Sequence, residues 1–181
     1  MPAFISLFRG INVGGQHKVK MSDLKEMHES LGLRDVLPYI QSGNVVFKSD
    51  DADVAQLQGQ IEDGFEKRFG FHVEVFVRTS AELRDIIDKN PFQGQQSKES
   101  KWVAVMFLAD RPDDTAQEDL LKTYAGPEEL FIIGKEIYIY YPNGIGRSKL
   151  SNTFIEKKLK IAGTARNWNT ILQWQGMILH R

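Results

Sequence analysis

The first half of the chain has hydrophobic residues at the spacings of strands and helices, in the order strand, helix, strand, strand, helix, strand. Apolar runs and alternating apolar and polar residues predict the strands, whereas apolar residues every three or four positions predict the helices. We expect strands at 4–8, 36–41, 44–47 and 71–77, a helix that Ser22 caps and Gly32 ends, and a second helix at 54–69. This order predicts the split βαβ, or ferredoxin-like, unit, in which two helices cover one face of an antiparallel sheet.

The second half repeats this order without a clear repeat of its residues. A capping-box pattern at Thr79 and Glu82 predicts a linking helix that Asn90-Pro91 ends, and the polar stretch at 93–101 predicts a linker. Beyond it we expect strands at 102–109, 130–133, 137–141 and 164–166, and helices at 115–124, 154–162 and 168–178. The fold class that follows is α+β, with two ferredoxin-like subdomains, antiparallel sheets and an added C-terminal helix.

We assign residues 1–78 to the first ferredoxin-like subdomain, 79–101 to the linking helix and loop, and 102–181 to the second subdomain with the C-terminal helix. In a split βαβ unit the first and second strands run parallel, so the loops that follow them emerge at the same rim of the sheet. The loop after the first strand should therefore meet the hairpin turn at 42–44. In the second half, the loop after the third strand leaves from the opposite rim.

Composition narrows the class of protein. The chain has 181 residues, of which 41% are hydrophobic and 10% aromatic, which is enough for a buried core. It has no cysteine, so it has no disulfide framework, thiolate nucleophile or cysteine metal site, and this suits a reducing cytosol. The first residues lack a basic leader, and no later run reaches the roughly 20 apolar residues of a membrane span. We therefore expect a cytoplasmic protein with no membrane partner.

Charge is distributed unevenly, although the net charge is only −1. Residues 147–181 contain seven Lys or Arg residues and one acidic residue. Such a basic segment either forms a surface for a polyanion or is the solvated face of one helix, balanced in space by the acidic middle of the chain. The acidic pairs, among them Glu128-Glu129, are interpreted as helix caps and solvated turns.

Two glycine-rich loops carry cationic residues. The first, at 9–15 (RGINVGG), is followed by Lys18 and Lys20, and the second, at 143–149 (NGIGRSK), carries two cations of its own. Each loop follows a predicted strand and precedes a predicted helix. Its glycines leave backbone N–H groups uncovered by side chains, and the helix N-terminus favours negative charge, so the loops are suited to binding a phosphate or carboxylate. The second loop is the stronger candidate, because its cations lie just ahead of helix donors.

Each loop also has a purely structural interpretation. The first is a tight turn that needs glycine conformations, and the second leads into an ordinary helix that Thr153 and Glu156 cap. The first loop has neither the Walker spacing nor the Gly-x-Gly-x-x-Gly pattern, so it gives no direct support for a nucleoside triphosphate or a dinucleotide.

A third cluster, at 166–170 (RNWNT), places a planar cation, two amides and an indole together. These groups are suited to stacking on a base and hydrogen-bonding to it. Alternatively they form a structural corner, in which Asn167 or Asn169 caps the final helix and Trp168 enters the core.

Conventional catalytic patterns do not occur in the sequence. Neither His-x-x-x-His nor Gly-x-Ser-x-Gly is found, so we expect no metal and no cofactor, and we can name no catalytic residue. RNA-binding domains of similar topology stack bases on aromatic residues of the sheet, and Phe76, Tyr138 and Tyr140 are the outward-facing candidates here. No RNP1-like string accompanies them.

These motifs, in this order, resemble those of the bacterial domain-of-unknown-function family 1697. The segments that carry the resemblance are 9–15, 18–21 (KVKM), 39–47 (YIQSGNVVF), 77–79 (VRT), 90–92 (NPF), 146–150 (GRSKL) and 164–170 (TARNWNT). The resemblance implies a two-lobed α+β fold in proteins without an established activity, and it supplies no catalytic residue. The ending at 173–175 (QWQ) departs from a more aliphatic pattern, which concerns only the packing of the last helix.

The leading functional hypothesis is the binding of a phosphate-bearing ligand, either a nucleotide or nucleic acid, through the two glycine-rich loops. One alternative is an enzyme that acts on a small anionic metabolite in a cleft between the lobes. A second alternative is a structural module for self-association, and the oligomeric state stays open. The candidate ligand-binding residues are Arg9, Gly10, Asn12, Gly14, Gly15, Lys18, Lys20, Asn44, Gly144, Gly146, Arg147, Ser148, Lys149, Arg166, Asn167 and Asn169.

Overall fold

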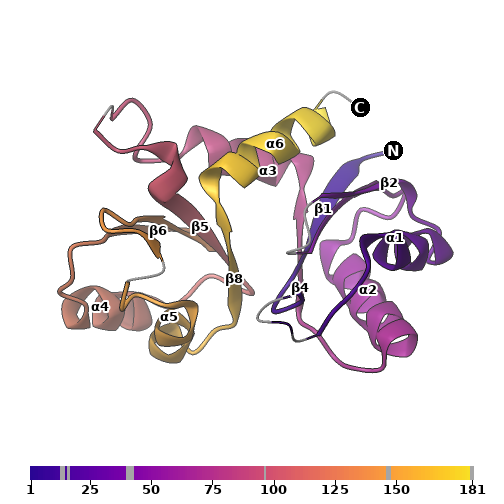
Figure 1. The fold of residues 1–181 in the computed structure, drawn as a ribbon, viewed down its shortest axis with the longest axis horizontal. Coiled ribbons are helices and arrows are strands. Elements are labelled where there is room, and N and C mark those ends of the chain that lie inside the picture. The colour runs from indigo at the N-terminus through magenta and orange to yellow at the C-terminus, as the bar shows by residue number, and fades with distance from the viewer. Residues whose placement is uncertain (13–14, 16, 40–42, 96, 146–147, 180–181) are drawn as a thin grey trace. The chain divides into compact units, whose positions relative to one another are not determined.

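The computed structural model describes residues 1–12, 15, 17–39, 43–95, 97–145 and 148–179 (Figure 1). The chain divides into two compact units: unit 1 contains Met1–Asp85 and Trp174–Arg181, and unit 2 contains Ile86–Gln173. These boundaries differ from the expected ones because helices α3 (Ser80–Asp88) and α6 (Trp168–Leu179) each contribute residues to both units. Within the described residues, no helix combines the length and the hydrophobicity needed to span a bilayer.

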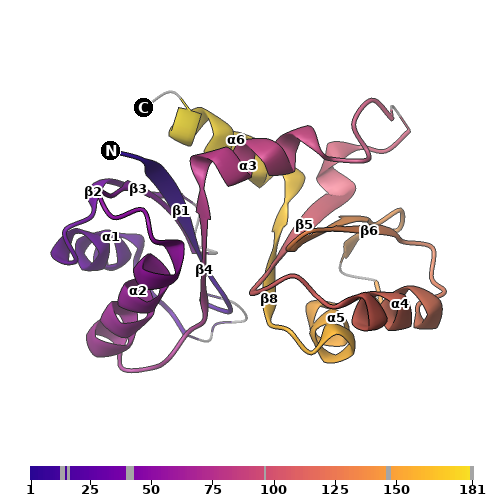
Figure 2. The same cartoon turned by 180° about the vertical axis from the view of Figure 1, so that it is seen from behind.

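Unit 1 contains a four-stranded antiparallel sheet with two helices on one face (Figures 1 and 2). The order of the strands in the sheet is β2-β3-β1-β4. In chain order, the elements are β1 (Ala3–Phe8), α1 (Met21–Ser30), β2 (Arg34–Tyr39), β3 (Asn44–Lys48), α2 (Val54–Phe69) and β4 (Val75–Thr79). This is the ferredoxin-like order that the hydrophobic pattern predicts, so the fold class is confirmed for this half.

Local sequence signals explain where α2 and α3 begin and where α2 ends. Asp53 caps α2 by accepting a hydrogen bond from the backbone N–H of Gln56 at 3.2 Å, and Gly70 follows the helix with a φ of 81°. Thr79 and Glu82 form the predicted capping box at the start of α3. Each side chain accepts the backbone N–H of the other residue at 3.0 Å.

Helix α1 begins earlier than the sequence predicts. Met21 is its first residue, and Lys20 occupies the N-cap position, where its side chain makes no capping hydrogen bond. Ser22 therefore lies inside the first turn, and its predicted role as the cap is wrong. The physical reason lies in the preceding loop, where the side chain of Asn12 fixes Val19 through two hydrogen bonds and so sets the start of the helix.

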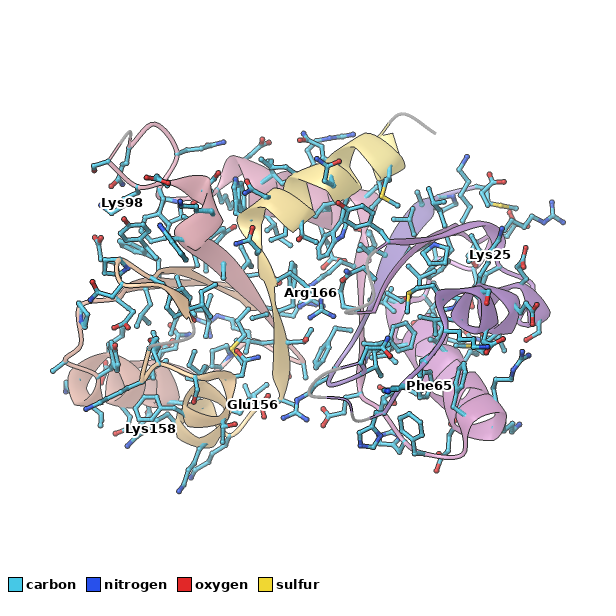
Figure 3. The ribbon with its side chains drawn as sticks, in the orientation of Figure 1. Lys25, Phe65, Lys98, Glu156, Lys158 and Arg166 are labelled. Carbon is cyan, nitrogen blue, oxygen red and sulfur yellow. The ribbon has the colours of Figure 1, made fainter. Side chains whose placement is uncertain are left out.

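The core of unit 1 lies between the sheet and the helices α1 and α2. Phenylalanine dominates it, since Phe4, Phe8, Phe47 and Phe65 are each at most 1% exposed. Phe4 and Phe47 stack across β1 and β3 with ring centroids 5.6 Å apart. Phe65, labelled in Figure 3, comes from α2. The apolar residues that recur along α2 at helical spacing thus face the sheet, as an amphipathic helix requires.

Unit 2 has the same arrangement as unit 1. Its antiparallel sheet has the order β6-β7-β5-β8, and α4 and α5 lie together over one face (Figures 1 and 2). After a short 3₁₀ turn at Ser100–Trp102, the elements are β5 (Val103–Leu108), α4 (Asp114–Thr123), β6 (Glu129–Ile133), β7 (Glu136–Tyr140), α5 (Asn152–Leu159) and β8 (Gly163–Asn167). The expected structural duplication is therefore present in the strand order.

Ser151 caps helix α5. Its side chain accepts the backbone N–H of Phe154 at 3.1 Å. The capping box expected from Thr153 and Glu156 is therefore not the cap, because Thr153 already lies within the helix.

The duplication extends to one buried side chain in each unit. Arg78 on β4 lies opposite Ile5 of β1, and Arg166 on β8 lies opposite Val105 of β5. Each guanidinium group donates from Nη1 to the carbonyl oxygen of the residue before it, at 3.2 Å and 2.9 Å respectively. Both residues are at most 7% exposed. The two halves thus share a buried arginine with the same hydrogen bond to the preceding carbonyl oxygen.

Candidate functional site

The first glycine-rich loop is closed by the side chain of Asn12. Its Nδ2 donates to the carbonyl oxygen of Val19 at 3.1 Å, and its Oδ1 accepts the backbone N–H of Val19 at 2.8 Å. The residue has a φ of 55°, and its own N–H donates to the carbonyl oxygen of His17. Both polar atoms of the amide are used within the protein. Asn12 therefore shapes the loop and positions Lys18 and Lys20.

A pocket of about 500 Å³ opens beside this loop, and the first turn of α1 forms part of its wall. Lys18 and Lys20 are exposed, and neither side chain forms an ion pair with any described residue. Asp23 is the acid among the lining residues, and its Oδ1 lies 3.5 Å from Nη2 of Arg68, which offsets its charge. The lining residues are Asn12, Gly15, Lys18, Val19, Lys20, Met21, Asp23 and Phe69.

Two other predicted residues of this loop, Arg9 and Gly10, do not line the pocket. Arg9 and Gly10 are exposed, and Gly14 lies outside the described residues. The predicted meeting of this loop with the hairpin after β2 is confirmed at Ile11, because a Cβ atom added to Gly43 would lie only 2.7 Å from Cδ1 of Ile11.

Asn44 supports the hairpin between β2 and β3. Its side chain is fully buried, and Nδ2 donates to the carbonyl oxygen of Tyr39 at 3.0 Å. A buried amide keeps such a bond because losing it leaves a polar group without a partner. Asn44 does not line the pocket at α1.

The second glycine-rich loop binds a carboxylate of the protein. Ser148 donates from Oγ to Oε1 of Glu128 at 2.5 Å, and the same Oγ accepts the N–H of Leu150 at 3.0 Å. Glu128 also accepts a hydrogen bond from the hydroxyl of Tyr124. From the sequence, Glu128 is interpreted as part of a solvated turn, and its link to the loop is missed because the two residues are 20 positions apart.

Two further predicted residues of the second loop, Gly144 and Lys149, are among the described residues. Gly144 has a φ of 87°, a conformation that favours glycine, and its N–H donates to the carbonyl oxygen of Tyr141 at 3.1 Å. Lys149 is exposed. The predicted site residues Gly146 and Arg147 lie outside the described residues.

Arg166 joins Ser148 and Asn167 in the lining of a pocket of about 460 Å³ at the start of α5. Burial lowers the pKa of Arg166 to about 10, and its Nη1 donates to Oγ1 of Thr164 at 2.5 Å. Side chains alternate along β8, and Ala165 packs into the core under α5. The guanidinium group of Arg166 therefore lies on the other face of the sheet and points away from α5 (Figure 3).

The cluster at 166–170 forms a structural corner. Asn167 donates from Nδ2 to the carbonyl oxygen of Lys101 at 2.8 Å, and its Oδ1 accepts the N–H of Asn169 at 2.9 Å, at the start of α6. Trp168 is 6% exposed, and Asn169 is exposed. These contacts agree with the alternative in which an asparagine caps the final helix and the indole enters the core.

The two glycine-rich loops therefore differ in what they offer to an anion. After the second loop, Ser151 caps the helix and Glu128 contributes a negative charge. After the first loop, the N-cap side chain of Lys20 makes no capping hydrogen bond, and two exposed lysines precede the helix. On the described residues, the first loop therefore offers an anion two exposed lysines, whereas the second loop already binds a carboxylate of the protein.

The sheet aromatics considered for base stacking do not form an exposed surface. Phe76 and Tyr138 are each 1% exposed, and the hydroxyl of Tyr138 donates to the carbonyl oxygen of Ile86 at 2.6 Å. They lie on the sheet face away from the paired helices, as expected, because their neighbours Val77 and Ile139 pack in the helix-covered cores. That opposite face is also buried, so the expected exposure for stacking is wrong. Tyr140 is half-buried, with its ring 6.0 Å from that of Phe92. Within the part of the chain that the structure describes, no group of three potential metal ligands occurs.

Comparison with known proteins identifies the fold and gives no activity. Residues 1–138 match the model of the family described as "Protein of unknown function (DUF1697)". Among solved structures, the chain is similar to the conserved bacterial protein SP0830 from Streptococcus pneumoniae, with a TM-score of 0.74 and 24% sequence identity over 99% of each chain. At this identity the likeness shows the fold alone. A search of curated proteins gives no match.

Proposed function

Because the chain belongs to DUF1697, a family of proteins of unknown function, we propose its function from its own geometry: it binds a nucleotide, a phosphate-bearing ligand, in the pocket at the start of α1. The observation that carries this proposal is that Lys18 and Lys20 lie at the start of α1, where the N-cap side chain makes no capping hydrogen bond. Neither lysine forms an ion pair with a described residue, so both charges are available to a ligand.

The start of α1 supports the binding of a phosphate group. Backbone N–H groups in the first turn of a helix have no partner within the helix, and the N-cap residue of α1, Lys20, has a side chain that accepts none of them. The positive end of the helix dipole and the two lysine charges act in the same direction. Arg68 offsets the charge of Asp23, so the acid opposes an anion less than its position alone implies.

The pocket also supports a ligand larger than free phosphate. Its volume of about 500 Å³ is typical of small-molecule sites. Val19, Met21 and Phe69 give it an apolar wall, against which a base or sugar can pack. We therefore favour a nucleotide over a long nucleic acid, which an open basic surface would suit better.

Isothermal titration calorimetry with ADP, adenosine and inorganic phosphate tests the proposal. ADP should bind at least about tenfold more tightly than adenosine, because only ADP carries the charges that the lysines and the helix N-terminus recognise. Phosphate should bind more weakly than ADP, because it leaves the apolar wall unfilled. A single-stranded DNA that binds more tightly than ADP would support nucleic acid as the ligand and count against a nucleotide.

The double variant Lys18→Ala, Lys20→Ala should weaken ADP binding by about tenfold or more. Lys25→Ala is the matched control, because Lys25 is an exposed lysine of α1 that does not line the pocket (Figure 3). The proposal is wrong if the double variant binds ADP as the control does, or if the unaltered protein binds ADP and adenosine equally.

A further inference from the structure

Unit 2 contains a second pocket, of about 650 Å³, at the junction of α4, β6 and α5. We call it the Glu128 pocket, and it is separate from the phosphate-binding proposal for unit 1. Its walls combine aromatic rings, one carboxylate, one amide and one ammonium group. The lining residues are Thr123, Tyr124, Ala125, Gly126, Pro127, Glu128, Asn143, Lys149 and Phe154.

The carboxylate of Glu128 is held in place by hydroxyl groups. It accepts hydrogen bonds from Tyr124 and from Ser148, the latter at 2.5 Å. Among the described residues, no lysine or arginine forms an ion pair with Glu128. Hydroxyl donors orient a carboxylate without neutralising it, so the half-buried negative charge remains for a cationic ligand group.

Aromatic rings stand next to this carboxylate. The rings of Tyr124 and Phe154 lie with their centroids 6.1 Å apart, at an interplanar angle of 62°. The ring of Tyr124 lies close over Gly126, where a Cβ atom would overlap its side chain. Gly126 therefore allows the ring to approach Glu128. An ammonium group near a carboxylate and aromatic faces gains from both, while an apolar group can cover the rings.

Lys149 supplies the opposite charge. Its side chain is exposed and forms no ion pair with a described residue, although it lines the same pocket as Glu128. A simple amine would be repelled by this ammonium group, and a simple carboxylate would be repelled by Glu128. A ligand that carries both charges satisfies both side chains.

We propose that the Glu128 pocket binds a small zwitterion, an apolar or aromatic amino acid. Its ammonium group contacts Glu128, its carboxylate contacts Lys149, and its side chain packs against Tyr124 and Phe154. Asn143, at the edge of the pocket, is an additional hydrogen-bonding group for the carboxylate.

Three probes that each carry a phenyl group distinguish the contributions of the two charges. L-phenylalanine carries both charges, phenethylamine only the ammonium group, and 3-phenylpropionate only the carboxylate. Calorimetric titration of the full chain should show L-phenylalanine binding about tenfold more tightly than either of the others, because each lacks one charge-assisted contact. Equal binding of phenethylamine and L-phenylalanine, or no binding of L-phenylalanine, would overturn the proposal.

Two variants assign the charges to residues. Glu128→Gln keeps the shape of the side chain. It should weaken the binding of L-phenylalanine about tenfold, whereas 3-phenylpropionate should bind as before or more tightly. Lys149→Ala should weaken the binding of L-phenylalanine by a similar factor, whereas phenethylamine should bind as before or more tightly. The matched controls are Glu118→Gln and Lys157→Ala, since both residues are exposed on α4 and α5 and do not line the pocket.

The outcome does not depend on the phosphate site. The double variant Lys18→Ala, Lys20→Ala should bind L-phenylalanine as the unaltered protein does. If circular dichroism shows that Glu128→Gln does not fold, titration of Lys149→Ala with the three probes still tests the proposal. Lys149 is exposed, so its replacement leaves no buried gap. Unchanged discrimination among the probes in Lys149→Ala would contradict the proposal.

Discussion

The hydroxyl oxygen of Ser6 lies 2.9 Å from Nε2 of His28, inside the core of unit 1. On the other side of the ring, Nδ1 lies 2.8 Å from the carbonyl oxygen of Leu24, which only accepts, so Nδ1 carries the proton and Nε2 accepts from Ser6. The ring is fully buried between Phe8 and Phe47. Burial lowers the pKa of His28 from 6.5 to about 4, so the folded protein holds it neutral.

We expect the free energy of unfolding to decrease as the pH falls from 6.5 to about 4. In this range the unfolded chain binds a proton at His28 and the folded chain does not, so protonation favours unfolding. Above pH 6.5 both states hold the ring neutral and its contribution is complete. The full effect is about 3 kcal/mol, and urea unfolding at about pH 7, 5 and 4 measures it.

His28→Leu removes this titration and should flatten the pH dependence between those values, although it lowers stability at neutral pH by disturbing the core. His72→Gln is the matched control, because His72 is exposed and should leave the dependence unchanged. If His28→Leu retains the original pH dependence, carboxylates and not His28 are responsible.

The side chain of Asn12 should contribute both to stability and to the proposed phosphate site. Asn12→Ala removes two hydrogen bonds to Val19 and should lower the free energy of unfolding by about 1–3 kcal/mol. It should also weaken ADP binding, because the backbone that carries Lys18 and Lys20 is no longer fixed. Urea unfolding and calorimetric titration measure the two effects.

Asn12→Gly separates the backbone from the side chain, since glycine adopts the φ of 55° without strain. It should be more stable than Asn12→Ala and should bind ADP equally weakly. Unaltered ADP affinity in both variants would show that the amide does not position the lysines.

One glycine inside helix α2 and the glycine that follows it should respond to alanine in opposite directions. Gly59 lies in an exposed part of the helix interior with open space around it, so Gly59→Ala should raise the free energy of unfolding by about 0.5–1 kcal/mol. Gly70 ends the helix at a φ of 81°, so Gly70→Ala should lower it by about 1 kcal/mol. Thermal unfolding of both variants checks the signs, and two shifts in the same direction would contradict this account.

The arrangement of strands and helices could be predicted from the sequence because its determinants are local. Alternating residues such as Val73, Val75 and Val77, and the capping pair Thr79 and Glu82, act over a few positions. The family resemblance implied the same two-lobed fold. Predictions at this level therefore needed no knowledge of distant contacts.

The candidate sites could be predicted less well because distant contacts determine them. The sequence predicts a cationic loop around Lys18 and Lys20, but it does not indicate the bond from Val19 to Asn12 that precedes the start of α1. The sequence around Glu128 is typical of a solvated turn and does not indicate its bond to Ser148, 20 positions away. Neither relationship has a short sequence signal.

Unit 1 is assembled from both ends of the chain, since Trp174–Arg181 joins Met1–Asp85. A ribosome delivers residues from the N-terminus onward, and domains fold as their residues emerge. Unit 2 is one continuous stretch, so the nascent chain completes it while unit 1 still lacks Trp174, a fully buried side chain. Unit 1 therefore begins to be synthesised before unit 2 and is completed after it.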